Sequence, residues 1–191
     1  MWSVDELIVA PATLPGDGSR SIVRLAGADL AGLLARMVEA VAGERFPAPG
    51  SPPRAVAAVF AGGLAAEWGP LAVTVLHWPG SGGPIGGPLA ELQLPCSQPL
   101  VDAVVAEACR HGARLARGGE FTVRAFLAGR LDLVQAEAVL AVVDARTPEE
   151  LARALDRMAG GAGRRLVEIR AATIDLLADI EAAIDFADEA T

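Results

Sequence analysis

Apolar residues recur at the short spacing of β-strands in the first part of the chain and at helical spacing in the last part. Strand-like runs, separated by stretches rich in Gly and Pro, lie at residues 7–10, 22–25, 55–61, 71–77 and 89–95, with a short strand or edge at 113–118. Helical spacing marks residues 29–42, with Asp29 as the N-cap, and residues 99–111. This part of the chain therefore predicts a mixed α/β unit.

The chain beyond Gly119 shows helical patterns only. Asp132 and Gln135 have the spacing of a capping box, which predicts a helix that continues to about Ala145. Thr147, followed by Pro and two Glu residues, predicts a second helix start. A third, long helix is expected from about Arg164 to Asp188. Its apolar stripe has near-heptad spacing and consists of Leu166, Ile169, Thr173, Leu176, Leu177, Ile180, Ala183 and Ile184.

These patterns predict an α+β chain, with a mixed α/β domain at residues 1–117 and an all-helical segment at residues 118–191. No later segment of the printed sequence covers the apolar stripe of the long helix. We therefore expect that stripe to pack on a partner segment, on another chain or on the first domain.

The composition supports a folded chain with an acidic surface. Of the 191 residues, 52% are hydrophobic and 21% are charged, which allows a substantial core and argues against global disorder. The net charge of -8 disfavours autonomous tight binding to nucleic acid, although a local arginine patch could still contact a phosphate backbone. Contact with RNA is therefore expected to be indirect.

All 16 cationic residues are Arg, and the sequence contains no Lys. A phosphate-binding P-loop needs a Lys after its glycines, so the glycine-rich segments "GSGGPIGG" and "GAGRRL" are interpreted as flexible loops. We expect no GTP hydrolysis by this chain alone.

The Cys and His residues do not form a metal-binding pattern. Cys96 and Cys109 lack the spacing of a metal framework and are expected to be reduced thiols of a cytoplasmic protein. His77 is interpreted as a strand-end residue and His111 as a helix C-terminal residue favoured by the helix dipole. No apolar run reaches the roughly 18 residues of a membrane span, and the first residues lack the basic region of a signal peptide.

Two charged residues interrupt apolar strands in the first domain. Arg24 lies in "SIVRLAG", and Glu91 lies within "PLAELQLP". Simple alternation would place each side chain in solvent at the surface of the sheet. The alternative is that Arg24 faces a ligand at the mouth of the sheet and that Glu91 accepts from the N–H groups of an aminopyrimidine-like ring.

Two arginines, Arg124 and Arg130, lie six positions apart in "GGEFTVRAFLAGRLDL". The Gly pair permits a tight turn, and Phe121, Phe126 and Leu127 are spaced to anchor a short helix. Both arginines could be solvated or could cap carbonyl groups at helix ends. The alternative is that Arg130 points into a pocket and holds a carboxylate through a bidentate fork.

Three segments resemble the family of tRNA-modification GTPases of the MnmE/TrmE type. They are "DELIVAPATLPGDGSRSIVRLAG", "GGEFTVRAFLAGRLDLVQAEAVLAVVDA" and "IEAAIDFADE". The resemblance implies a folate-binding, aminomethyltransferase-like and dimerising domain at residues 1–117, followed by the first part of the helical domain at residues 118–191, without the G domain. It further implies a role in one-carbon modification of the tRNA wobble uridine, as a homodimer working with a flavoprotein partner.

The resemblance also assigns three cofactor-binding residues. The contacts of the family with 5-formyltetrahydrofolate, or a related tetrahydrofolate, map onto Arg24, Glu91 and Arg130, and no metal and no catalytic residue is implied. The sequence departs from the family next to these positions: Ile85 and residues 86–88 replace "TGED", and residues 95–98 replace a His-Gly turn. These departures support an alternative, a degenerate dimeric scaffold that has lost folate. A one-carbon transferase acting alone has little support, because no general base or nucleophile accompanies the three residues.

Overall fold

The computed structural model describes residues 4–13, 16, 18–60, 64, 68–159 and 161–187 of the chain, with side chains described for 166–184 of the last range. The chain divides into two compact units, residues 1–130 and 131–191. The sequence placed this division between residues 117 and 118, whereas the structure includes the short helix α3 (Glu120–Leu127) in the first unit. The reason is that charged side chains of α3 bond to residues near the edge strands of the sheet.

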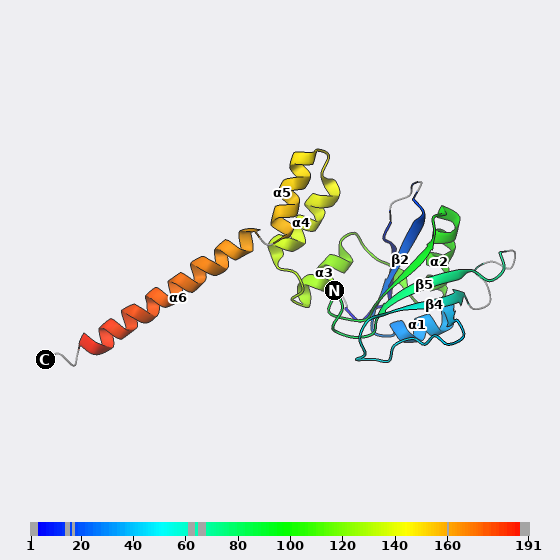
Figure 1. Ribbon diagram of the computed structural model, residues 1–191, viewed down its shortest axis with the longest axis horizontal. Coiled ribbons are helices and arrows are strands. Elements are labelled where there is room, and N and C mark those ends of the chain that lie inside the picture. Colours follow the sequence, from blue (N-terminus) through cyan, green and yellow to red (C-terminus); the bar gives the residue numbers. More distant parts are fainter. Residues whose placement is uncertain are drawn as a thin grey trace. The chain divides into compact units, whose positions relative to one another are not determined.

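The first unit is built on a seven-stranded sheet with the order β3-β4-β5-β6-β2-β1-β7 (Figure 1). The strands are β1 (Ile8–Pro11), β2 (Arg20–Ala26), β3 (Val38–Ala40), β4 (Arg54–Phe60), β5 (Ala72–Trp78), β6 (Leu89–Pro95) and β7 (Arg114–Leu115). Every neighbouring pair is antiparallel except β1 with β7, which is parallel. The predicted α+β class is thereby confirmed.

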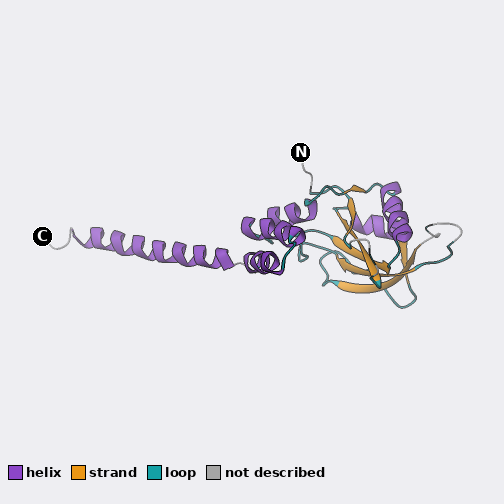
Figure 2. Cartoon of the chain, turned by 90° about the horizontal axis from the view of Figure 1, so that it is seen from above, coloured by secondary structure: helices purple, strands orange, loops and turns teal. Residues whose placement is uncertain are grey.

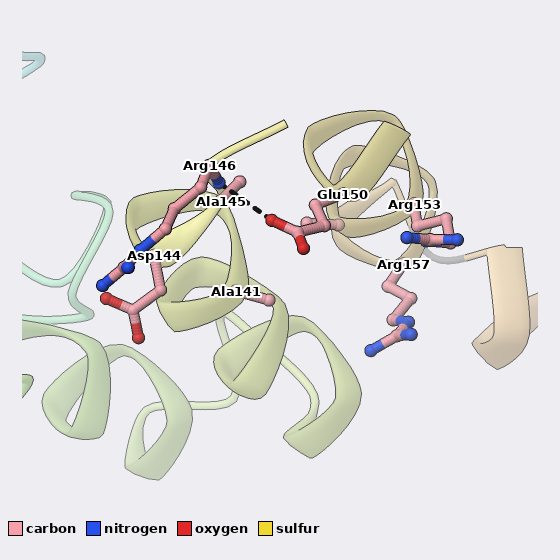
Figure 3. Close-up of a pocket in the computed structure, with 8 residues that line it drawn as sticks. Ala141, Asp144, Ala145, Arg146, Glu150, Arg153 and Arg157 are labelled. Carbon is pink, nitrogen blue, oxygen red and sulfur yellow. Dashed lines mark hydrogen bonds between the residues drawn. The ribbon is translucent and has the colours of Figure 1, made fainter. Parts of the chain in front are cut away.

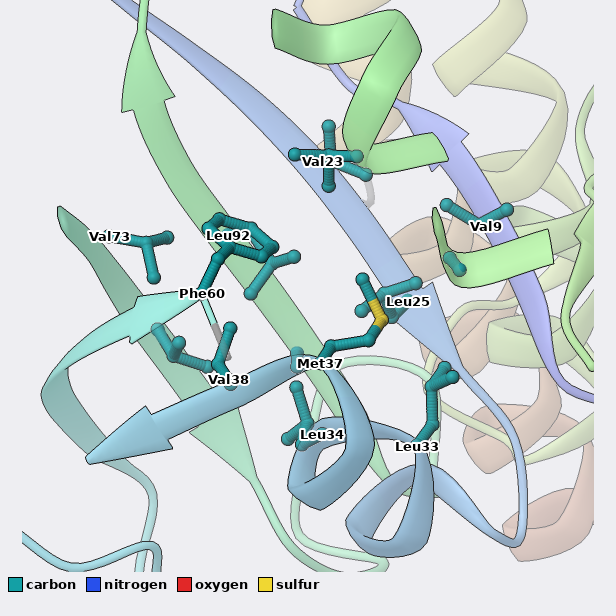
Figure 4. Packing of buried hydrophobic residues seen from close by; sticks show 14 of the residues in the cluster. Val9, Val23, Leu25, Leu33, Leu34, Met37, Val38, Phe60, Val73 and Leu92 are labelled. Carbon is teal, nitrogen blue, oxygen red and sulfur yellow. The ribbon is translucent and has the colours of Figure 1, made fainter. Parts of the chain in front are cut away.

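The core of the first unit lies between one face of the sheet and two helices, α1 (Leu30–Met37) and α2 (Gln98–Arg110). Side chains alternate along each strand, so the strands send every second residue to this face. Figure 4 shows Leu33, Leu34 and Met37 of α1 packed against strand residues that include Leu25 and Leu92. The opposite face of the sheet carries partly exposed side chains, as the alternating burial of β2, β5 and β6 shows.

One helix prediction was wrong at its C-terminal end. Residues 29–42 were expected to be helical, but the helix ends at Met37 and residues Val38–Ala40 form β3. Val38 pairs with Phe60 of β4 and is buried in the core, so pairing with the sheet overrides the helical spacing of this apolar run. The predicted N-cap Asp29 makes no capping hydrogen bond and instead pairs with Arg36 at 3.1 Å.

The second unit is all-helical, with α4 (Leu133–Asp144), α5 (Pro148–Met158) and α6 (Gly161–Ala187) (Figure 2). The predicted capping box is confirmed, because Gln135 N–H donates to the Asp132 carboxylate at 2.7 Å and the Gln135 side chain accepts from Asp132 N–H at 2.9 Å. Thr147 accepts from Glu150 N–H at 3.2 Å, which confirms the second predicted start.

The long third helix starts earlier than expected. Its first turns include the "GAGRRL" segment that was interpreted as a loop, whereas the expected end at Asp188 lies outside the described residues. Pro15 and Asp17, from the Gly- and Pro-rich stretch between the first two predicted strands, lie outside them as well. All side chains described for α6 are exposed, including the large apolar residues of the stripe, namely Leu166, Ile169, Leu176, Leu177, Ile180 and Ile184.

The loop between β5 and β6 touches the C-terminal end of α3 at a glycine. Gly86 has a φ of +70°, and a Cβ atom at this position would lie 2.1 Å from Cβ of Ala128. Both the backbone conformation and the close approach therefore require glycine here. This contact holds the loop before β6 against the residue that follows α3.

We predict that Gly86→Ala lowers the free energy of unfolding by about 1–3 kcal/mol, because the added methyl group combines a left-handed backbone with a clash. Gly87→Ala is the matched control, since a Cβ at Gly87 meets no atom within 4 Å. Urea unfolding followed by circular dichroism measures both variants. Equal stability of the two variants would contradict the proposed contact.

Candidate functional site

Arg24 and Glu91 meet on the partly exposed face of the sheet. The register of β2 against β6 places Arg24 directly opposite Glu91. The Nε and Nη2 atoms of Arg24 both donate to Oε1 of Glu91, at 2.9 and 2.6 Å. The side chains are 37% and 14% exposed respectively, so the pair is partly withdrawn from water and still reachable from solvent. The structure thus brings together two of the three predicted cofactor-binding residues.

The pair retains unused hydrogen-bonding capacity on both sides. Within the described part of the chain, Oε2 of Glu91 accepts no hydrogen bond and Nη1 of Arg24 donates none. The ring of Phe121 lies beside the guanidinium, with its centroid 5.6 Å from Cζ of Arg24. The site therefore presents a free carboxylate acceptor, a free guanidinium donor and an aromatic ring close together.

A second polar pair follows on the same face of the sheet. Arg20 donates to the side-chain oxygen of Gln93 at 2.8 Å. Arg20 lies four positions before Arg24 on β2, and Gln93 lies two positions after Glu91 on β6. Thr74 and Leu76 of β5 lie opposite Gln93 and Glu91. These neighbours extend the polar surface along β6 and give the Arg24–Glu91 pair one apolar flank.

Arg130 contacts the backbone of a loop in the first unit. Its Nη2 atom donates to the carbonyl oxygen of Ser81 in the loop between β5 and β6. No hydrogen bond or ion pair joins Arg130 to Arg24 or Glu91 among the residues that the structure describes. Convergence of all three residues on one ligand stays a prediction.

A cavity of about 510 Å³ lies in the first unit between the loop before β6 and the end of α3. Its lining includes the loop segment from Ile85 to Pro88, Gly27 and Ala28 after β2, and Arg124 with Leu127 and Ala128. This volume lies within the range of small-molecule sites. Arg24, Glu91 and Arg130 are absent from the lining, so the cavity and the Arg24–Glu91 pair are separate features.

Sequence reasoning missed a charge cluster with two buried members, which we define as Glu120, Arg124, Arg114 and Glu6. Glu120 is 1% exposed and Arg124 is 4% exposed. Arg114 of β7 forks onto the Glu120 carboxylate with contacts of 2.7 and 2.9 Å and also contacts Glu6 at 2.6 Å. Arg124 donates to the Glu6 carbonyl oxygen at 2.9 Å and lies 3.4 Å from Glu120.

This charge cluster corrects the expected anchoring of α3. Phe126 and Leu127 were expected to anchor the helix, but they are 41% and 62% exposed, while Glu120 and Arg124 are buried. Of the two ordinary roles considered for Arg124, solvation is wrong, because its side chain is 4% exposed and donates to the Glu6 carbonyl oxygen. The sequence did contain a signal for this pairing: Glu120 and Arg124 are four positions apart, which places both side chains on one face of the helix. The expected tight turn is present, since Gly119 adopts a left-handed φ of 75° before α3.

The charge cluster shifts the ionisation of its members. Hydrogen bonding from Arg114 is the main cause that lowers the pKa of Glu120 from 4.5 to about 2. The hydrogen bonds with Glu120 and Glu6 raise the pKa of Arg114, whereas burial lowers that of Arg124. Both arginines stay protonated because the pKa of a guanidinium is so high.

The histidines occupy the kinds of positions that the sequence indicated. His77 lies near the end of β5, where burial lowers its pKa, and its ring meets Phe46 edge-on. His111 follows α2 and contacts Glu107 at 2.9 Å. Among the described residues, no three His, Cys, Asp or Glu side chains gather in a way that could hold a metal ion. None of the helices described combines the length and apolar character needed to cross a bilayer.

Comparison with known proteins identifies two matches along the chain. Residues 7–130 match the family described as GTP-binding protein TrmE N-terminus, and residues 133–191 match the MnmE helical domain. The chain is 43% identical over 185 residues to the tRNA modification GTPase MnmE of Rhodopirellula baltica, covering 97% of this chain and 39% of that relative. It is 34% identical over 186 residues to the protein of the same name from Moorella thermoacetica, with 97% and 40% covered. The chain thus spans about two fifths of the length of the curated relatives it matches.

We predict that Glu120→Gln destabilises the chain at neutral pH by about 3–5 kcal/mol, because the change removes the buried negative charge that pairs with Arg114 and lies 3.4 Å from Arg124. The pKa of Glu120 is lowered on folding, so its ionised form stabilises the chain above pH 4.5 and this contribution is lost as the pH falls towards 2. The stability difference between wild type and variant should therefore shrink on acidification.

The matched control for Glu120→Gln is Glu6→Gln, which removes a half-exposed carboxylate of the same charge cluster. We expect Glu6→Gln to lower the free energy of unfolding by less than about 1 kcal/mol. Urea unfolding at a series of pH values measures both variants. A pH-independent difference for Glu120→Gln, or an equal cost for the two variants, would contradict the role assigned to the buried carboxylate.

Proposed function

This chain belongs to the family of tRNA-modification GTPases of the MnmE type, and from that membership we propose that it binds a tetrahydrofolate one-carbon donor and holds two copies together. In this proposal the ligand is 5-formyltetrahydrofolate or a related tetrahydrofolate. The module serves modification of the wobble uridine in tRNA together with a flavoprotein partner. The observation that carries the proposal is the partly buried Arg24–Glu91 pair on the accessible face of the sheet.

The unused atoms of the pair suit one edge of a pterin. A pterin ring carries adjacent N–H groups and a ring carbonyl, which need an acceptor and a donor respectively. Oε2 of Glu91 supplies the acceptor and Nη1 of Arg24 the donor, and hydrogen bonds to charged groups are among the strongest in proteins. Phe121 offers an aromatic face next to the guanidinium.

Arg130 suits the other end of a folate, where carboxylates are found. Its contact with the Ser81 carbonyl uses one N–H of the five that a guanidinium carries. The remaining donors can hold a carboxylate in a bidentate fork. In this proposal Arg130 binds the carboxylate tail of the folate, while Arg24 and Glu91 bind the ring.

The alternative function is a degenerate dimeric scaffold without folate. One observation favours it: Arg24 and Glu91 already satisfy much of each other's charge at 2.6 Å. A ligand must therefore compete with, or add to, an existing ion pair. The two functions differ in one measurable property, since both require a dimer and only the first requires folate binding.

We expect calorimetry of the intact chain with 5-formyltetrahydrofolate to show binding that Glu91→Gln weakens by roughly 10–100-fold, which corresponds to one hydrogen bond to a charged group. Arg20→Gln is the matched control, since Arg20 belongs to the neighbouring polar pair on the same face. Circular dichroism verifies folding. Absence of heat with the wild type, alongside a dimer in sedimentation, would select the scaffold and refute the folate site.

A further inference from the structure

The second unit contains a hollow between α4 and α5 that the proposed function leaves unassigned. The hollow, which we call the arginine groove, has a volume of about 700 Å³. It is lined by Ala141, Asp144, Ala145, Arg146, Glu150, Arg153, Ala154 and Arg157. Figure 3 shows Asp144 and Arg146 on the α4 side of the groove and Arg153 and Arg157 on the α5 side.

Arginine is concentrated at this groove. Residues 131–159 contain three Arg residues, and all three line the groove, whereas only two of the six acidic residues in the same stretch do so. In a chain with a net charge of -8, a local excess of positive charge runs against the overall composition. The arrangement is therefore a distinct electrostatic feature of α4 and α5.

The three guanidinium groups of the groove have all their donors available. Within the part of the chain that the structure describes, the side chains of Arg146, Arg153 and Arg157 form no hydrogen bond and no ion pair. The nearby Glu150 carboxylate is engaged by the backbone N–H of Arg146 at 2.9 Å. Small residues such as Ala154, which is 2% exposed, pack between α4 and α5 at the groove. The arginines are thus not needed to hold the two helices together.

The spacing of the arginines suits successive anionic groups. Arg153 and Arg157 are one helical turn apart on α5, so their side chains lie on the same face. Guanidinium groups bind phosphate oxygens through paired N–H donors. Asp144 lies across the groove and repels an anion, which directs a ligand towards the α5 side.

We propose that the arginine groove binds the phosphate backbone of RNA, with Arg153 and Arg157 as the principal contacts. The proposal rests on the role in tRNA modification proposed above, because that role brings tRNA to the protein. The net charge of the chain makes this a local and salt-sensitive contact that positions the RNA without reading its bases. An acidic segment of another protein is the competing occupant.

The test is fluorescence anisotropy of the full chain with labelled tRNA over a series of salt concentrations. Each lost phosphate contact should weaken binding roughly fivefold to tenfold at about 0.1 M salt and reduce the slope of log K against log salt by about one. We expect this loss for Arg153→Gln and for Arg157→Gln, and about twice the change in slope for the double variant.

Two further variants make the test specific to the groove. Asp144→Asn should strengthen tRNA binding, because it removes the repelling carboxylate, whereas Arg170→Gln on α6 makes the same charge change as the arginine variants outside the groove and should leave binding unchanged. No binding of tRNA by the wild type, or equal losses for Arg157→Gln and Arg170→Gln, would overturn the proposal. Folate calorimetry of the same variants reports on the proposed function separately, since the groove contains none of the residues assigned to folate.

Discussion

The buried carboxylate of Glu120 is the interaction on which the end of the first unit depends. It receives both arms of Arg114 and the backbone N–H of Arg117, and it lies next to buried Arg124. A carboxylate removed from water is tolerated only when positive charge and hydrogen bonds compensate for the lost hydration. The charge cluster meets that requirement and ties α3 to β7 and to Glu6, which lies two residues before β1. The same attachment holds Phe121 beside Arg24 and Ala128 against Gly86. The surroundings of the Arg24–Glu91 pair and the position of the loop before β6 therefore both depend on the charge cluster.

Alternation and capping were sufficient to predict most elements of this fold. Each longer strand was predicted to within a few residues because its alternating apolar positions face a single core. The two helix starts at Asp132 and Thr147 were predictable because a cap depends on residues within one turn. The strand Val38–Ala40 was not predictable in this way, because a short apolar run fits a helix and a strand equally well. Its pairing with β4 makes it a strand. The anchoring of α3 was missed because burial of a Glu and an Arg depends on partners far away in the sequence.

The candidate site shows the same division between local and distant information. Arg24 and Glu91 were recognised as charged residues in apolar strands, but their contact spans 67 positions and follows only from the register of β2 with β6. Arg130 was recognised from its place before a helix, yet its contact with Ser81 depends on the conformation of a glycine-rich loop. The arginine groove gave no signal in the sequence, because its lining comes from two helices whose packing brings Asp144 opposite Arg153 and Arg157.

The two outermost strands of the sheet are unusually short. β3 has three residues and β7 has two, and β7 continues into the segment that the charge cluster fastens. Each border of the sheet therefore ends in a strand of only two or three residues. An extended segment of another protein can form few backbone hydrogen bonds with such short outer strands, which protects the protein from edge-to-edge aggregation. The partly exposed face of the sheet stays accessible.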